Sequence, residues 1–256
     1  AIREKYPEIQ ICGTAGPFHT PSSDYIEGWL FAFEHQDIID LVDEHYYEKH
    51  DYFETSRQYD SYPREGKTKV YLGEYASKDK KMRDALAEAL YLLHVERNGD
   101  IVCMTSYAPL FARKNATNWN PDLIYFDNER PFLTCSYYVQ QMFGQSSADY
   151  FYGDCVQFEG EKTNMQEQSV VLNTKTRKLY VKICNASGET RKANIDLRRF
   201  KGMKSAATLT TLSGQPDQEN NYEAQPVKPV VEKVKVKGKM AVELKPYSFI
   251  MYTINL

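Results

Sequence analysis

The chain has 256 residues, of which 42% are hydrophobic and 26% charged, so it is long enough for one large or two ordinary domains with a sizeable core. A formal net charge of −3 without a basic stripe argues against a nucleic-acid partner, and no apolar run approaches the roughly 20 residues of a membrane span. The 5 cysteines are scattered without a CxxC spacing, which argues against a zinc site or a disulfide framework.

The N-terminal segment, residues 1–7, resembles the last turn of a helix that Pro7 brings to an end. It has none of the features of a signal peptide. We therefore expect further residues upstream of Ala1. The localisation then stays unknown from this sequence, and a secreted or periplasmic parent protein is the expectation.

Four short apolar runs, residues 9–12, 41–43, 70–72 and 101–104, begin about 30 residues apart, which is the length of one βα unit. The runs are nearly continuous rather than alternating, as in strands that are buried on both faces of a parallel sheet. Cys12 and Cys103 fall within these runs and are predicted to be small core residues.

The segments between the runs have helical character. Residues 23–36 and 79–98 place apolar side chains at helical spacing, and a weaker helix is predicted around residues 52–59. After the fourth run, the sequence predicts a long loop. A last helix is then predicted to begin with Pro131 and to end at Gly144.

From about residue 155 the pattern changes to short alternating or β-branched runs that are separated by turn residues. Such regular short strands are typical of a β-sandwich. The predicted strands are residues 169–172, 179–184, 193–197, 207–212, 230–236, 240–244 and 248–254.

The four βα units fit either a small open sheet or half of an eight-stranded barrel, which typically needs about 250 residues. The sequence contains no GxGxxG motif and no P-loop, either of which would favour the open sheet. Composition and periodicity alone leave both architectures open.

Polar residues follow the second run, where parallel α/β folds carry their working residues. His45 and Tyr47 are two residues apart, so an extended strand projects both to one face, and Glu44 and Tyr46 to the other. If the strand lines a barrel, one of these pairs faces the pocket. The alternative is that they are ordinary polar residues at a strand end.

Glu74 directly follows the third run and Gly73, whose missing side chain allows a ligand or another backbone to approach closely. A carboxylate at this junction is costly to bury unless it is paired or functional, and it could equally be a cap or an ion-pair partner. On the loop after the fourth run, Trp119 could stack on a sugar ring or pack the loop onto the fold.

These residues stand in a recognisable series of motifs. The motifs are Val42-Asp43-Glu44-His45-Tyr46-Tyr47, Tyr71-Leu72-Gly73-Glu74-Tyr75-Ala76, Ser106-Tyr107-Ala108-Pro109-Leu110-Phe111 and Trp119-Asn120-Pro121-Asp122-Leu123-Ile124. In this order and spacing, they closely resemble the α-L-arabinofuranosidases of glycoside hydrolase family 51. The resemblance is specific over about residues 1–145 and loose over the β-rich region.

The resemblance implies an α/β part followed by an all-β part. Residues 1–147 would be the C-terminal half of a (β/α)₈ barrel, with four βα units, and residues 148–256 a jelly-roll-like β-sandwich. It implies a retaining glycoside hydrolase that releases terminal α-L-arabinofuranosyl residues from arabinose-containing polysaccharides or oligosaccharides, without a metal or organic cofactor.

The resemblance also implies roles for individual residues. Glu74 corresponds to the catalytic nucleophile of the family. His45 and Tyr47 correspond to residues that line the sugar subsite and contact the nucleophile, and Trp119 is expected to bind substrate.

The family's general acid/base is a Glu in an Asn-Glu pair after the fourth barrel strand, which would lie upstream of Ala1. The chain's own Asn128-Glu129 pair comes after the eighth barrel strand and is interpreted as part of the start of a helix. The acid/base is therefore expected to be absent from this chain, and the chain alone is expected to be inactive.

Two other classes of protein were weighed. A non-catalytic carbohydrate-binding or scaffold module would expose aromatic residues on the sandwich. The candidates lie mostly in strand patterns typical of a core, and they are Tyr180, Tyr222, Tyr247 and Tyr252. An open-sheet α/β hydrolase would need a Gly-x-Ser-x-Gly motif, which the sequence lacks. For partners, we expect a saccharide, no nucleic acid, no membrane, and self-association through the unpaired edges of a half barrel.

Overall fold

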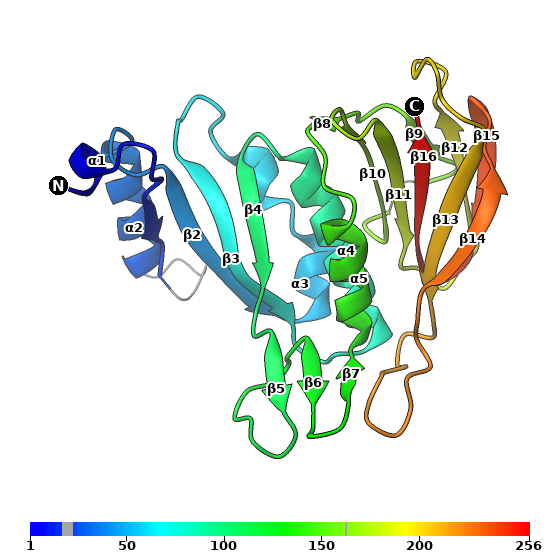
Figure 1. Ribbon diagram of the computed structural model, residues 1–256, viewed down its shortest axis with the longest axis horizontal. Helices are drawn as coiled ribbons and strands as arrows, with labels where there is room; N and C mark the ends of the chain where they lie inside the picture. Colours follow the sequence, from blue (N-terminus) through cyan, green and yellow to red (C-terminus); the bar gives the residue numbers. More distant parts are fainter. Residues whose placement is uncertain (17–22, 162) are drawn as a thin grey trace. The chain divides into compact units, whose positions relative to one another are not determined.

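The structure is a computed structural model that describes residues 1–16, 23–161 and 163–256 (Figure 1). The chain divides into two compact units. The first comprises residues 1–47, 58–76 and 98–108, and the second comprises residues 48–57, 77–97 and 109–256.

The first unit is built on a parallel sheet. Its elements are α1 (Ile2–Lys5), β1 (Cys12–Thr14), α2 (Ser23–Glu34), β2 (Leu41–Glu48), η1 (Gln58–Ser61), β3 (Lys69–Ser77) and β4 (Val102–Tyr107), with the last residues of β2 and β3 falling in the second unit. The strands follow the order β1-β2-β3-β4, and β1 with β2 and β3 with β4 pair in parallel. The prediction of four neighbouring strands is therefore confirmed, and parallel pairing is confirmed for β1 with β2 and for β3 with β4.

Strand β2 has two different faces. Its side chains alternate between buried and partly exposed from Val42 onward. Helix α2 covers the buried side, where Ala32 packs with Ala15, Ile39 and Val42. The other side presents the partly exposed residues, because successive side chains of a strand project to opposite faces.

The second unit contains helices, a small sheet and a β-sandwich. Its elements before the sandwich are α3 (His50–Thr55), α4 (Met82–Arg97), β5 (Phe111–Arg113), β6 (Ile124–Phe126), β7 (Pro131–Leu133) and α5 (Cys135–Gly144). Its sandwich strands are β8 (Tyr150–Phe151), β9 (Val156–Phe158), β10 (Gln166–Asn173), β11 (Lys178–Asn185), β12 (Arg191–Asp196), β13 (Ala206–Ser213), β14 (Val230–Lys235), β15 (Lys239–Leu244) and β16 (Ser248–Asn255).

The sandwich consists of a six-stranded sheet in the order β14-β13-β16-β11-β10-β8 and a three-stranded sheet in the order β15-β12-β9. Its core is made of side chains from both sheets, among them Val181, Ile195 and Ile254. The prediction that the chain is almost wholly β from residue 155 is confirmed. Helix α4 packs against β10 and β11 of this sandwich, and the Cys184 thiol donates a hydrogen bond to the Leu86 carbonyl (3.8 Å).

Five expectations from the sequence were wrong. The strands of the parallel sheet are not buried on both faces, since β2 alternates and most of β4 is exposed or partly exposed. The long loop expected after β4 contains the short strands β5 and β6. Residues 131–133 are not the start of a helix but strand β7, which pairs with β6; helix α5 begins after Thr134, whose hydroxyl accepts a hydrogen bond from the Tyr137 N–H. The Asn128-Glu129 pair accordingly lies in the exposed turn between β6 and β7. Cys12 and Cys103 are exposed rather than core residues.

Helix α4 also buries a carboxyl group without a cationic partner. Glu88 is fully buried and accepts a hydrogen bond from the Ser77 N–H (2.9 Å). Burial removes the solvation of its charged form and raises the pKa of Glu88 to about 8. The carboxyl group is therefore protonated in the folded chain at neutral pH.

This shift predicts a pH dependence of stability. An unfolded chain releases the Glu88 proton at its ordinary pKa, so between about pH 5 and 8 the unfolded state binds fewer protons and stability falls as the pH rises. Glu88→Gln should flatten this slope by up to about 1.4 kcal/mol per pH unit, measured by urea denaturation. Glu243→Gln, at an exposed position of β15, is the control, and equal slopes for both variants would contradict the assignment.

Candidate functional site

A β-bulge in β3 turns Glu74 toward β2. Leu72 lies opposite Thr105 of β4 and Tyr75 lies opposite Tyr107, so Gly73 and Glu74 together occupy the place of one partner residue. Such a bulge re-aims a side chain. Leu72 and Tyr75 are both fully buried. Without the extra residue, Glu74 would follow Leu72 to the buried face, but the bulge lets it project to the more exposed face.

Glu74 meets both residues that the sequence predicted beside it. The Tyr47 hydroxyl donates a hydrogen bond to Glu74 Oε2 (2.6 Å), and His45 Nδ1 lies 3.5 Å from the same oxygen. The Glu74 side chain remains 41% exposed. The arrangement is thus an oriented carboxylate with a hydroxyl donor, an imidazole and an accessible side.

Asp43 is a fourth member of this group, and the sequence reasoning missed it. Its Oδ2 lies 2.9 Å from His45 Nε2. The alternation of β2 would have identified it, because Asp43, His45 and Tyr47 are spaced by two residues and share one face. The Asp43–His45–Glu74–Tyr47 group joins β2 to the bulge of β3.

Glu44 lies on the opposite face of β2 and is 1% exposed. Its Oε1 accepts hydrogen bonds from Trp29 Nε1 (2.8 Å) and the Tyr62 hydroxyl (2.6 Å), and its Oε2 accepts from the hydroxyls of Tyr46 (2.8 Å) and Tyr59 (3.1 Å). We call these five residues the Glu44 cluster. Neutral donors from α2, β2 and the η1 region thereby converge on one buried carboxylate.

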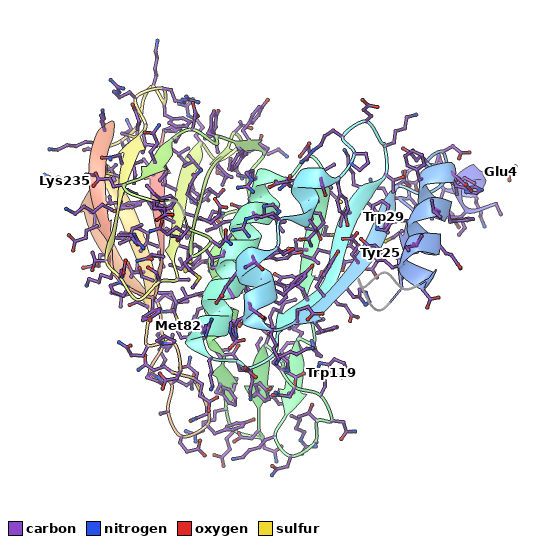
Figure 2. All side chains as sticks on the ribbon, turned by 180° about the vertical axis from the view of Figure 1, so that it is seen from behind. Glu4, Tyr25, Trp29, Met82, Trp119 and Lys235 are labelled. Carbon is purple, nitrogen blue, oxygen red and sulfur yellow. The ribbon has the colours of Figure 1, made fainter. Side chains whose placement is uncertain are left out.

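Tyr25 adjoins the Glu44 cluster, with its hydroxyl 3.2 Å from Glu44 Oε1 and 2.8 Å from the Tyr62 hydroxyl (Figure 2). Burial, together with the negative charge of Glu44, raises the pKa of Tyr25 to about 12 and raises that of Tyr62 as well. Both hydroxyls therefore stay protonated as donors. The two pairs on β2 thus have different surroundings. His45 and Tyr47 lie beside Glu74, whereas Glu44 and Tyr46 belong to the buried cluster on the face that α2 covers.

Trp119 belongs to the second unit, on the loop between β5 and β6. Its side chain is 52% exposed, and its backbone N–H donates a hydrogen bond to Thr117 Oγ1 (3.2 Å). About half of the residue surface is therefore accessible to solvent. Its role stays a prediction.

Within residues 1–16, 23–161 and 163–256, one trio has the composition of a metal site. One ligand atom each of His50, Asp79 and Asp84 lie within 4.8 Å of one another. However, the Asp84 carboxylate already accepts hydrogen bonds from the Ser77 hydroxyl and the Lys81 N–H at the start of α4. The trio is therefore accounted for as a helix cap with neighbouring polar residues.

A family model described as the α-L-arabinofuranosidase C-terminal domain matches residues 59–248. An extracellular exo-α-L-arabinofuranosidase of Streptomyces chartreusis is 37% identical over 150 residues, which cover 58% of this chain and 18% of that protein. α-L-Arabinofuranosidase 2 of Arabidopsis thaliana is 35% identical over 156 residues, which cover 57% of this chain and 21% of that protein. The aligned segments thus span about a fifth of the length of these relatives.

Solved structures of similar fold include arabinose-bound MgGH51 α-L-arabinofuranosidase, with a TM-score of 0.82 and 23% identity over 99% of this chain and 41% of that one. The arabinose complex of the α-L-arabinofuranosidase from Thermotoga maritima has a TM-score of 0.72 and 19% identity over 100% of this chain and 59% of that one. At these identities the likeness concerns the fold.

The hydrogen bonds of the Glu44 cluster predict that a single substitution at Glu44 destabilises the fold. Glu44→Gln should lower the free energy of unfolding by about 3 kcal/mol or more, because a neutral amide has one acceptor oxygen and presents N–H groups to hydroxyl and indole donors. Glu27→Gln, at an exposed position of α2, should change it by less than about 0.5 kcal/mol. Urea denaturation measures both, and a loss at Glu44 no greater than at Glu27 would refute the structural role.

Proposed function

The chain belongs to the α-L-arabinofuranosidase C-terminal domain family, as found in family 51 glycoside hydrolases, and from this we propose that it is part of a retaining glycosidase that releases terminal α-L-arabinofuranosyl residues. The substrates are arabinose-containing polysaccharides or oligosaccharides. The observation that carries the proposal is the exposed carboxylate of Glu74, which Tyr47 and His45 hold at the end of a parallel strand.

In this mechanism Glu74 is the nucleophile. Its carboxylate oxygen forms a bond to the anomeric carbon as the glycosidic bond breaks, and the departing oxygen takes a proton from a second carboxyl group. Water, deprotonated by that second group, then hydrolyses the arabinosyl ester and restores the Glu74 carboxylate. The Tyr47 hydroxyl orients the nucleophile, because it donates a hydrogen bond to Glu74 Oε2 (2.6 Å).

The second carboxyl group must stand about 5–5.5 Å from Glu74 in a retaining enzyme. Asp43 is joined to His45, and Glu44 is buried on the other face of β2, so neither is free to protonate a leaving group. We assign the acid/base to a Glu outside these 256 residues, after the fourth strand of the complete barrel. Residues 1–147 would then be the C-terminal half of that barrel, and residues 148–256 its accompanying β-sandwich.

The length of the curated relatives favours a half barrel over a complete open sheet, because they are several times longer than the aligned segment. Among the described strands, β1 and β4 are the outer strands of the sheet, and further strands of a barrel could pair with them. Trp119 would offer a stacking surface for a sugar ring.

The location of the complete protein is also a proposal. The Streptomyces relative is named as extracellular, which supports a secreted parent. In the part of the chain that the structure describes, no helix has both the length and the apolar character to cross a membrane.

A non-catalytic carbohydrate-binding module is less well supported. Its aromatic residues would have to be exposed on the sandwich, yet Tyr180 and Tyr252 are 6% and 8% exposed. Such a module would also give no reason for the hydrogen-bonded group around Glu74.

The nucleophile assignment predicts the effect of one substitution. In the longer polypeptide, Glu74→Ala should lower turnover of an aryl α-L-arabinofuranoside by about 10⁴–10⁶-fold, the range found when a unit that includes the nucleophile is broken. Glu27→Ala is the matched control and should turn over substrate like the wild type. Unchanged activity of the Glu74 variant would overturn the assignment.

The missing acid/base predicts that the 256-residue chain alone is nearly inactive. Loss of acid/base catalysis costs about 10²–10⁴-fold, and loss of the loops on the other barrel half adds to this. The unpaired edges of β1 and β4 should also promote self-association, which sedimentation would detect. Turnover by the isolated chain that Glu74→Ala abolishes would place an acid/base within these residues.

A further inference from the structure

We propose that Asp43 is a positioning residue that keeps a proton on His45 Nε2 and so confines proton exchange of the ring to Nδ1, beside Glu74. The inference rests on the proposed function only in so far as Glu74 is the nucleophile. Asp43 has no part in the mechanism proposed above.

The distances favour Asp43 as the partner that fixes the ring. Asp43 Oδ2 lies 2.9 Å from Nε2, whereas Glu74 Oε2 lies 3.5 Å from Nδ1. An ionised carboxylate only accepts hydrogen bonds, so the shorter contact requires the proton to be on Nε2. The hydrogen bond made by one ring nitrogen decides which nitrogen is free to exchange.

The surroundings hold Asp43 in this place. A Cβ at position 73 would lie 1.8 Å from Asp43 Oδ1, so the glycine of the bulge provides the space that the carboxylate occupies. Oδ1 is itself buried and has no hydrogen-bond partner among the described residues. The carboxylate is thus wedged against β3, with His45 as its hydrogen-bonding partner.

Few other titratable groups reach this ring. On β2 they are Asp43 and Tyr47, and on β3 the group is Glu74, whose Oε2 also takes the Tyr47 hydrogen bond. On β1, the Cys12 thiol senses the charge of Asp43, and burial together with that charge raises the pKa of Cys12. No cationic side chain among these competes with His45 for Asp43.

In the reaction, Asp43 fixes the His45 ring and Tyr47 orients Glu74. With Nε2 committed to Asp43, the imidazole does not swing toward Glu74, and the nucleophile keeps its closest contact, 2.6 Å, with the neutral Tyr47 hydroxyl. Glu74 is then oriented without being tied into a tight ion pair. When Glu74 loses its charge in the covalent step, Asp43 still holds His45.

The test is nitrogen NMR of the histidine rings in the longer polypeptide, labelled with ¹⁵N on histidine. The spectrum of His45→Gln identifies the His45 signals. Over about pH 5 to 9, wild-type Nε2 should keep the chemical shift of a protonated nitrogen, and any titration should appear at Nδ1. In Asp43→Leu, Nε2 should lose its proton at the upper end of this range, because Glu74 is then the remaining carboxylate and draws the proton to Nδ1.

Tyr71→Phe is the matched control, because it removes a hydroxyl of β3 whose hydrogen-bond partner is the Ser106 hydroxyl (2.8 Å). It should give the wild-type pattern. Asp43→Ala also removes the acceptor and serves if the leucine variant does not fold. Loss of the Nε2 proton in the wild type, or a variant whose Nε2 stays protonated throughout, would overturn the proposal. The readout involves no turnover, so a failure here is distinct from a failure of the proposed activity.

Discussion

The two-residue alternation of strand β2 is the constraint on which the site depends. Asp43 and Glu44 are neighbours in sequence and carry the same charge, yet the strand sends them to opposite faces of the sheet. Asp43 joins His45 and Glu74 on the partly exposed face. Glu44 enters the layer beneath α2, where hydroxyl and indole donors surround it. If the strand shifted by one residue, Asp43 and Glu44 would exchange faces. Both the group around Glu74 and the Glu44 cluster would then lose their hydrogen bonds.

The two glutamates differ in what their surroundings permit. Burying a charge is costly unless hydrogen bonds replace its hydration, and Glu44 receives them on both oxygens. A carboxylate so fully occupied has no lone pair to offer an incoming carbon. Glu74 accepts one short hydrogen bond and stays 41% exposed, which leaves it oriented and available. The Glu44 cluster fixes the strand, and the fixed strand positions the partners of Glu74.

Much of the fold and part of the site could be predicted from the sequence. The recurrence of apolar runs about 30 residues apart identified the parallel strands, because this is the length of one βα unit. The expected burial on both faces did not hold, since β2 alternates between buried and partly exposed residues and most of β4 is exposed or partly exposed. The strands β5 to β7 were missed because three-residue strands are too short to show a period, and the Thr134 cap was overlooked in favour of Pro131. Asp43 lay within the predicted strand and needed only the alternation rule. The Glu44 cluster needed tertiary contacts, because its donors reach Glu44 from up to 18 residues away in the sequence, which periodicity does not encode.

The central claim is that Glu74 is the carboxylate that becomes covalently bonded to the sugar. The most direct measurement uses the longer polypeptide and an epoxide-bearing analogue of α-L-arabinofuranose, which esterifies the nucleophile of a retaining glycosidase. Proteolysis and mass spectrometry then locate the modified residue. The account predicts one adduct, on the peptide that contains Glu74, and none after Glu74→Gln. An adduct on Asp43, on Glu44 or on a carboxylate outside β2 and β3, with Glu74 unmodified, would contradict it.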